Sequence, residues 1–513
     1  MYHESRIQKS LLNARVNTIC YFLNLVFAFF SRKIFIDHLG VDFIGLQGTL
    51  SSFLQFLNIA ELGIGSAIGY VLYQPIYDGD KTKINEVVSV FGYLYRWIGN
   101  VILIAGLILS CFLPLIFPHT VFNMGIIFLG FYAYLFSSIL GYFANYKSVL
   151  LSADQRNYEV TGYYQAIQMV KTVMQMLFAY YITSFVLYFT IEIAFGIIYS
   201  LILNWRIRVI YPWLKTEIKL GRKILKKYPE ISKYVKQLFV HRIATFVQFQ
   251  MMPVVIYGFA SLPVVALYGN YTTISERLKG FINGVLDSTV AGIGNLISEG
   301  NKEKIFELYK ELFSFRYWAA GILASCFFFL STDFIVVWLG RQYVLSPLLV
   351  ILISIIFFYN IARNVTDQFI NGYGLFYDVW APVTECVIFV AASVYFGYFY
   401  GLEGVLLGPI ISSTLIIYIW KPYFLFTKGF KIPFHKYWIL FFTNVSLIIA
   451  SYLLSGVITN IIISQPVNGW LVWIEKSFIY FIIMSVSSFI LFYFLSQGMR
   501  GFINRLFKAR RNK

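Results

Sequence analysis

Three basic side chains fall inside apolar stretches that are long enough to cross a membrane. They are Lys171, Arg277 and Lys279. A cation at the centre of a spanning helix costs about 2.5 to 3.5 kcal/mol on insertion scales, so such a residue generally faces water, a partner or a substrate. Arginine and lysine are the side chains that bind phosphate groups. The three cations therefore indicate a site for an anion within the membrane.

Arg277 and Lys279 lie on different faces of one predicted helix. At 100° per residue, Lys279 shares its face with two acids, Glu276 and Asp287, whereas Arg277 shares its face with small polar residues such as Asn270. We therefore expect Arg277 to face water or a substrate, the alternative being a pair with an acid from another helix. Lys279 can contact the same substrate or pair with Glu276 three residues before it.

Lys171 and Arg32 are further candidates for the anion site. Lys171 lies in the predicted helix 160–181, and Glu192 in the next helix can neutralise it as an interhelical pair. Arg32 ends the first predicted helix on the outer side. It either anchors that helix end at the interface or meets the substrate phosphate in an outward-facing state.

Amide side chains line one face of two predicted helices. They are Asn13, Asn17 and Asn24 in the first helix, and Asn360, Asn364, Asp367 and Asn371 in the tenth, where an acid joins them. Such groups can hydrogen-bond the hydroxyls of a sugar. They can equally hold neighbouring helices together, and the sequence leaves both interpretations open.

Carboxylates within the membrane could couple transport to an ion gradient. The candidates for ion coupling are Glu61, Glu192 and Asp287, with Asp378 and Glu385 also available. The four cysteines and five histidines are scattered at no spacing typical of metal ligands. We therefore expect no catalytic residue, no metal and no cofactor.

Composition shows what must position these residues. Hydrophobic residues make up 59% of the 513 residues, charged residues 13%, and the mean hydropathy is +0.70, which is typical of an all-α polytopic membrane protein. About fourteen apolar segments approach the 20 residues that a spanning helix needs. We predict spans at 14–36, 43–72, 97–117, 121–145, 160–181, 185–205, 237–259, 262–296, 317–338, 344–368, 379–400, 402–425, 437–458 and 474–496.

The distribution of charge sets the topology. With the N-terminus in the cytoplasm, most of the 41 Lys and Arg residues fall on the cytoplasmic side, including Arg363 and Lys421. This asymmetry follows the positive-inside rule and predicts that both termini are cytoplasmic. The net charge of +17 therefore needs no nucleic acid to explain it. The basic segment 206–236 is expected to lie against anionic lipid.

An internal repeat divides the chain. Gly63-Ile64-Gly65, Asp80-Lys81-Thr82-Lys83-Ile84 and Tyr95-Arg96-Trp97 recur as Gly292-Ile293-Gly294, Asn301-Lys302-Glu303-Lys304-Ile305 and Arg316-Tyr317-Trp318. A repeat in the same direction, six spans apart, predicts two six-helix bundles of equal orientation. It also places Arg96 and Arg316 at the cytoplasmic border.

The repeat and the spans give the domain organisation that we predict. It comprises a first bundle at 1–205, a cytoplasmic linker at 206–236, a second bundle at 237–428, and two further helices with a basic tail at 429–513. Aligning the Gly-Ile-Gly words without gaps places Arg277 opposite Gly48 and Lys279 opposite Leu50. Because neither counterpart carries charge, we expect the substrate phosphate to bind toward the second bundle.

Several short sequence segments of this chain resemble those of polysaccharide flippases of the O-antigen and capsule type. The segments are Leu39-Gly40-Val41-Asp42-Phe43-Ile44-Gly45-Leu46, Ala60-Glu61-Leu62-Gly63-Ile64-Gly65-Ser66-Ala67-Ile68, Tyr268-Gly269-Asn270-Tyr271, Val337-Trp338-Leu339-Gly340 and Gly401-Leu402-Glu403-Gly404-Val405-Leu406-Leu407-Gly408-Pro409. The resemblance covers nearly the entire chain. It implies the multidrug, oligosaccharidyl-lipid and polysaccharide exporter superfamily and alternating access between two lobes.

The resemblance also implies a substrate, a sugar repeat unit on polyprenyl pyrophosphate, which the protein would flip to the outer leaflet of a bacterial inner membrane. The expected partners are this lipid-linked oligosaccharide and membrane lipids, with the polysaccharide polymerase or assembly machinery as a further candidate, and we expect a monomer. Two alternatives remain. One is a cation-coupled multidrug exporter, which the absence of an acid in the first span disfavours. The other is a membrane glycosyltransferase or polymerase, which the short outer loops disfavour.

Overall fold

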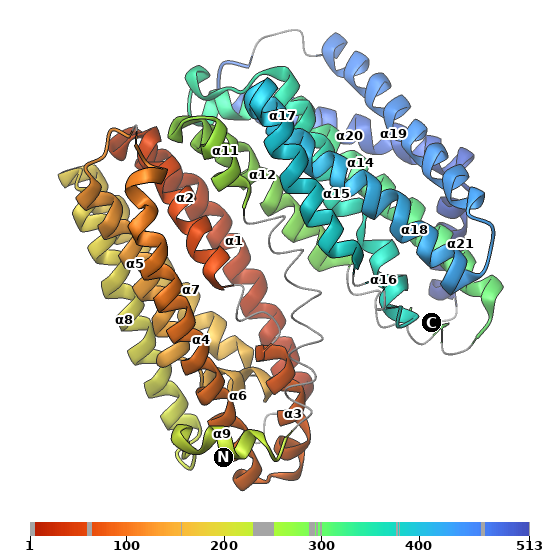
Figure 1. The fold of residues 1–513 in the computed structure, drawn as a ribbon. Coiled ribbons are helices and arrows are strands. Elements are labelled where there is room, and N and C mark those ends of the chain that lie inside the picture. Colours follow the sequence, from red (N-terminus) through yellow and green to blue (C-terminus); the bar gives the residue numbers. More distant parts are fainter. Residues whose placement is uncertain are drawn as a thin grey trace. The chain divides into compact units, whose positions relative to one another are not determined.

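The computed structural model describes residues 6–58, 64–118, 120–154, 156–228, 251–286, 293, 296–297, 300–375, 378, 380–462 and 467–511 (Figure 1). All regular elements within these ranges are helices. Nine helices among the described residues are long and apolar enough to cross a membrane. The all-α membrane fold predicted from the sequence is confirmed. The chain forms two compact units, Met1–Ala266 and Leu267–Lys513, whereas the domain boundaries given above remain a prediction.

The described residues of the first unit form ten α-helices and the start of an eleventh. They are α1 (Arg6–Leu39), α2 (Val41–Leu57), α3 (Ile64–Asp78), α4 (Lys81–Ile116), α5 (Met124–Phe143), α6 (Ser148–Ala153), α7 (Asn157–Ile182), α8 (Phe185–Ile210), α9 (Gly221–Leu225), α11 (Met252–Phe259) and the first turn of α12 (Leu262–Leu286). α1 packs along α7, and α5 and α7 both pack on α8. These packed helices carry most of the polar residues discussed below.

In the second unit, the described residues form the remainder of α12 and eight further α-helices. They are α14 (Lys302–Trp338), α15 (Pro347–Ala362), α16 (Asn364–Gly372), α17 (Trp380–Ser413), α18 (Lys421–Phe424) between two π-helical segments, α19 (His435–Ile462), α20 (Trp470–Leu495) and α21 (Gln497–Arg511). α14 is central, because α15, α19, α20 and α21 all pack on it. Its buried face carries tyrosines and phenylalanines together with one arginine.

The repeat is visible in how α4 and α14 begin. Gly79 and Gly300 both have positive φ, at 70° and 76°, a conformation that glycine adopts without steric cost. The side chain of the next residue, Asp80 or Asn301, then accepts a hydrogen bond from the backbone amide three residues later, at 3.0 and 3.1 Å. Each helix is thus capped by the same turn. The two turns lie in the repeated segments that begin at Asp80 and Asn301.

Hydropathy located the apolar parts of these helices but not their full length. The predicted spans 97–117 and 317–338 are the C-terminal portions of α4 and α14, which both begin about four turns earlier. The predicted span 43–72 comprises α2 and α3. The mean hydropathy of a window is low over the charged first half of such a helix, so the window detects only the apolar second half. The backbone hydrogen bonds nevertheless continue through both halves.

α17 contains a reversal at Gly401, where the sequence predicted the boundary between two spans. Gly401 has φ 57° and ψ −132°. Beyond it, the Ser393 hydroxyl donates to the carbonyl oxygen of Val405 at 3.0 Å, although a continuous helix would separate these residues by about 18 Å. Gly404 and Gly408 lie so close to the first segment that a side chain at either position would clash with it. The two segments therefore form a tight hairpin.

A basic segment docks on the long helix of each unit through a glycine. Gly221 packs against the carbonyl oxygen of Ser89 in α4, and Gly498 packs against that of Lys310 in α14. Ser89 and Lys310 occupy equivalent positions in the repeat. The described part of the predicted linker is therefore fixed to α4. In the second unit, α21 docks on α14 in the equivalent way.

Candidate functional site

The first unit has an open polar cavity of about 380 Å³. Five helices contribute to its wall: α1, α2, α5, α7 and α8. Gly48 of α2 lies at the wall, as does Arg32 of α1. The cavity also contains two residues that the sequence singled out, Lys171 of α7 and Glu192 of α8. Three of the candidate site residues are therefore brought together here.

Lys171 and Glu192 form the predicted ion pair. The ammonium Nζ of Lys171 lies 2.8 Å from each carboxylate oxygen of Glu192, and the side chains are 11% and 13% exposed. Gln175, one turn after Lys171, donates to Glu192 Oε2 at 3.3 Å. A charge buried to this extent is stable only with such partners.

A tight connection holds α7 and α8 in the register that this pair needs. α7 ends at Thr183, which adopts a left-handed conformation with φ 53°. Ser184 then caps α8 by accepting a hydrogen bond from the amide of Leu187 at 3.3 Å. With a connection this short, the two helices run antiparallel and their facing residues are set by the turn. Gln175 also donates to the carbonyl oxygen of Tyr188 at 3.3 Å, which ties the helices a second time.

Arg32 reaches the same cavity from α1. Its Nη2 donates to the carbonyl oxygen of Ala266 in the first turns of α12, at 2.9 Å. α12 can begin this close to α2 because Gly45 has no side chain; a Cβ there would overlap the carbonyl of Leu262. Arg32 thus belongs to a cavity wall within the first unit, a location that the sequence could not distinguish from an interfacial anchor.

The wall of the cavity carries more positive than negative charge. Arg32 and Lys171 stand against Glu192. The remaining polar side chains can donate or accept hydrogen bonds: Ser31, Gln47, Ser51, Tyr134, Thr172, Gln175 and Tyr188. Gln47 is held in place by donating to the Tyr188 hydroxyl at 2.7 Å. This set suits an anion with hydroxyl groups attached to it.

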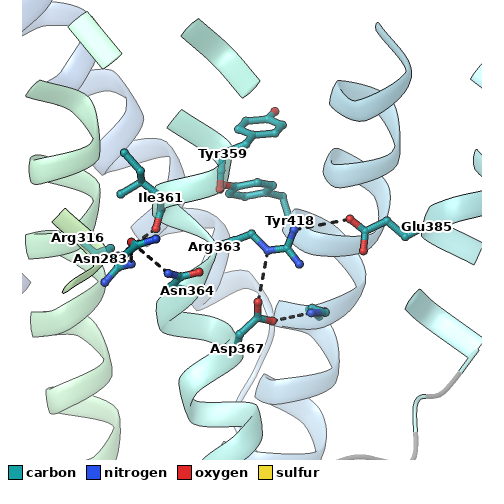
Figure 2. Close-up of polar contacts among 10 residues, drawn as sticks. Asn283, Arg316, Tyr359, Ile361, Arg363, Asn364, Asp367, Glu385 and Tyr418 are labelled. Atoms are coloured by element: carbon teal, nitrogen blue, oxygen red, sulfur yellow. Dashed lines mark hydrogen bonds and ion pairs between the residues drawn. The ribbon is translucent and has the colours of Figure 1, made fainter. Parts of the chain in front are cut away.

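The second unit contains a buried network of charges around Arg363 (Figure 2). Arg363 Nε donates to Asp367 Oδ2 at 3.4 Å, and its Nη1 lies 3.9 Å from Glu385 Oε1. Lys421 donates to the other oxygen of Asp367 at 2.6 Å. These four residues come from the α15–α16 junction, α16, α17 and α18. The network therefore ties together helices that are distant in sequence.

Arg316 extends this polar region from α14. Its side chain donates to the carbonyl oxygen of Ile361 at 3.0 Å and to the side-chain oxygen of Asn283 at 2.5 Å (Figure 2). Arg316 is 2% exposed, and its counterpart in the repeat is the buried Tyr95, whereas the neighbouring Arg96 is exposed. This network was not predicted from the sequence. The i, i+4 spacing of Arg363 and Asp367 was a signal that could have indicated part of it.

The amide candidates for sugar binding make contacts between helices. Asn24 donates to Gln165 of α7 at 2.7 Å. Asn364 donates to Asn283 at 3.3 Å, and Asp367 binds two cations as described above. Asn270 is completely buried. Their contacts agree with the interpretation that polar stripes hold helices together.

The remaining candidates lie on α12 or outside the described residues. Lys279 forms an ion pair with Glu276 at 2.5 Å, with side chains 18% and 55% exposed. Arg277 is half-buried on the same helix, and its role as a phosphate ligand remains a prediction. Glu61 and Asp287 lie outside the described residues, as do the side chains of Asn13 and Asn17.

The described residues contain no group of three or more His, Cys, Asp or Glu side chains that could hold a metal ion. The cavity of the first unit is thus a site of charge and hydrogen bonds. The sequence predicted phosphate binding toward the second bundle, whereas this cavity belongs to the first unit and includes Gly48, the counterpart of Arg277. The cavity presents a paired lysine and acid beside an arginine that is bonded to backbone.

No protein-family model matches the chain, and no curated protein matches its sequence. Solved structures do match its fold. "Lipid II flippase MurJ, inward closed conformation" aligns with a TM-score of 0.62 and 14% identity, over 93% of this chain and 99% of that one. The inward-facing conformation of "a multidrug resistance MATE family transporter of the MOP superfamily" aligns with a TM-score of 0.55 and 14% identity, over 78% and 92%. The chain therefore has the fold that these two transport proteins share.

Proposed function

We propose that this protein is a flippase that carries a polyprenyl-pyrophosphate-linked oligosaccharide from the inner to the outer leaflet of a bacterial plasma membrane. The observation that carries the proposal is the cavity of the first unit, where Arg32 and Lys171 face a single acid, Glu192. A transporter of an anionic headgroup needs positive charge inside the membrane. In this proposal, the cavity is exposed alternately to the two sides of the membrane, while the lipid chain stays among the acyl chains.

The size and polarity of the cavity support a headgroup of this kind. A pyrophosphate with the first part of a sugar fits within about 380 Å³, since small-molecule sites typically occupy roughly 300 to 1,000 Å³. The cations would bind phosphate oxygens by charge-assisted hydrogen bonds. Hydroxyls and amides such as Ser51, Thr172 and Gln47 would then bind the sugar.

The fold supports transport, and the sequence supports the cargo. One of the matching structures is by its title a lipid II flippase, a carrier of a lipid. The assignment of a polysaccharide precursor rests on the sequence words that resemble O-antigen and capsule flippases. We further propose that the protein lies in the inner membrane with both termini in the cytoplasm, as the positive-inside rule predicts.

Export of multiple drugs is a second candidate function, because the fold is also shared with a multidrug resistance transporter. A cavity for cationic drugs would need an acid whose charge is available to the ligand. Glu192 instead binds Lys171 through both carboxylate oxygens. The cavity wall also carries two cations, Arg32 and Lys171, against one acid, and this excess of positive charge favours an anionic cargo over a cationic one.

Leaflet exchange in vesicles tests the proposal. The protein is reconstituted with a fluorescent lipid-linked oligosaccharide, and its accessibility to a membrane-impermeant quencher is followed over time. Arg32→Gln should slow exchange at least about tenfold, because one charge-assisted hydrogen bond contributes about 1.5 to 3 kcal/mol. Lys33→Gln is the matched control, since Lys33 is 47% exposed and pairs with Asp37, and it should exchange at the wild-type rate.

The same vesicles distinguish the alternatives. Equal exchange rates for wild type, Arg32→Gln and empty vesicles would rule out the flippase proposal. Uptake of a cationic dye by those proteoliposomes would then support the multidrug exporter. Each variant is compared at equal protein content and equal melting temperature, so that a folding defect is not mistaken for a lost ligand.

A further inference from the structure

The pair formed by Lys171 and Glu192 lies where the proposed substrate phosphate must bind. Both side chains line the cavity, and the ammonium group of Lys171 lies 2.8 Å from both oxygens of the one Glu192 carboxylate. The carboxylate of Glu192 thus occupies the ligand position that a phosphate would take on Lys171. The substrate phosphate and the Glu192 carboxylate therefore compete for the ammonium group of Lys171.

We propose that Glu192 is an internal competitor for the substrate phosphate, and that substrate binding transfers Lys171 to the phosphate while Glu192 takes up one proton. This inference rests on the proposed function, because it assumes an anionic headgroup in the cavity. The proton comes from hydronium or buffer acid in the solvent, whose bond to hydrogen breaks as the O–H bond of the Glu192 carboxyl forms. One proton is gained for each headgroup bound, and the same proton is released when the headgroup leaves.

The surroundings of Glu192 explain why a proton must be gained. A carboxylate that loses its cationic partner in a poorly solvated site favours its neutral form, and a phosphate beside it adds like-charge repulsion. Gln175 donates to Glu192 Oε2 at 3.3 Å, but one neutral amide cannot replace a full charge. Arg32 approaches the cavity from α1 and is bonded to the carbonyl oxygen of Ala266. It does not replace Lys171 as the cationic partner of Glu192.

The groups around Glu192 come from every helix that packs on its site. The titratable ones are Lys171 and Tyr164 on α7, Tyr134 on α5, Tyr188 on α8 and Arg32 on α1. Tyrosine, lysine and arginine keep their charge state between pH 5 and 8 at their ordinary pKa values. Glu192 is therefore the group in this set whose charge a phosphate can change in that range.

The direction of the pH effect follows from linkage. If binding takes up a proton, the affinity for the phosphate rises as the pH falls, by at most one decade per pH unit for one proton. The competitor also acts on specificity. A neutral lipid entering the cavity cannot replace Glu192 on Lys171, so it leaves the ion pair intact and gains nothing from the lysine.

Binding of geranylgeranyl pyrophosphate to the purified full-length protein in detergent tests this inference. The dissociation constant is measured between pH 5.5 and 8.5 for wild type and Glu192→Gln. Because the probe titrates equally with both proteins, the difference between the two pH profiles reports on Glu192. We expect Glu192→Gln to bind at least about tenfold tighter at pH 8 and to lose up to one decade per pH unit of the wild-type slope.

A second pair of variants tests the role of Lys171. Lys171→Gln with Glu192→Gln removes both charges together and leaves no unpaired acid, so it should fold, and it should bind the probe more weakly than Glu192→Gln alone. Equal binding by these two proteins would overturn the inference, as would identical affinities and slopes for wild type and Glu192→Gln. A probe that binds none of the proteins at any pH would instead contradict the proposed function itself.

Discussion

Arg316 in α14 donates its Nε to the carbonyl oxygen of Ile361 at the end of α15, at a distance of 3.0 Å. This carbonyl lies in the last turn of α15, where the chain passes through Arg363 into α16. A guanidinium group from a neighbouring helix therefore binds the junction of α15 and α16. The same side chain also binds Asn283 of α12, so Arg316 connects three helices of the second unit.

Replacing Arg316 with alanine should destabilise the protein by about 3 kcal/mol or more. Two hydrogen bonds to a charged donor are lost, each contributing about 1.5 to 3 kcal/mol, and the carbonyl of Ile361 is left without its partner. Arg96→Ala is the control, because Arg96 is an arginine at a similar depth of α4, next to the counterpart of Arg316, but is exposed; it should change stability by less than about 0.5 kcal/mol. Thermal unfolding in detergent measures both. Equal losses would show that the contacts of Arg316 contribute nothing.

Tyr95 and Arg316, which occupy equivalent positions in the repeat, also show what the sequence could predict. Similar words predicted the same turn in both units, and the caps at Asp80 and Asn301 confirm it. Words of similar sequence cannot show which face of a helix meets a polar neighbour. That depends on α12 and α15, whose segments have different sequences in the two halves of the chain.

The cavity of the first unit was predictable only in part. An acid and a base in adjacent predicted helices pointed to the Lys171–Glu192 pair, because a short loop brings such helices together. Arg32 is far from both in sequence. Its place in the same cavity depends on how α1 packs along α7 and on the close approach of α12 at Gly45. Such packing distances between helices cannot be predicted from the spacing of charged residues in the sequence.

The pair of Lys171 and Glu192 should behave as a unit when stability is measured. Lys171→Met leaves Glu192 unpaired in a site that is only 13% exposed, and we expect a loss of about 3 to 5 kcal/mol. Lys171→Met with Glu192→Leu should recover most of that loss, because neither charge remains buried. Lys279→Met is the control, since its partner Glu276 is 55% exposed, and it should cost less than about 1 kcal/mol. A double variant as unstable as the single one would contradict this account of the pair.

Gly401 should resist substitution because of its backbone conformation. At φ 57° and ψ −132°, a β-branched residue is strained, and we expect Gly401→Val to destabilise the hairpin in α17 by about 1 to 3 kcal/mol. Gly456 lies inside α19, and no neighbouring atom lies within 4 Å of the place that a Cβ would take there. Gly456→Ala should therefore be neutral or stabilise the protein by up to about 1 kcal/mol. Denaturation by heat in detergent checks the order of the two. A Gly401 variant as stable as wild type would show that the turn has another conformation.

The docking of α21 on α14 should depend on Gly498. A larger residue there would clash with the carbonyl of Lys310 and the hydroxyl of Ser314. We expect Gly498→Leu to release α21, although Arg505 still pairs with Glu311, because an ion pair that is half exposed contributes at most about 1 kcal/mol. Limited trypsin digestion should then cut near Arg505 much faster than in wild type. Asn504→Ala, at an exposed position of the same helix, should leave the digestion rate unchanged, and equal rates for all three proteins would exclude this role of Gly498.

Arg277 and Lys279 should differ in their effect on leaflet exchange, although they are two residues apart. Lys279 already binds Glu276, so its charge is partly neutralised and Lys279→Gln should slow exchange by no more than about threefold. Arg277 lies on the polar face that the sequence assigns to the substrate, and Arg277→Gln should slow exchange about tenfold, in keeping with one lost charge-assisted hydrogen bond. Both are measured in the vesicle assay with the lipid-linked oligosaccharide. If Arg277→Gln exchanges lipid at the wild-type rate while Arg32→Gln does not, the phosphate site is confined to the first unit, and the prediction from the polar face of α12 is wrong.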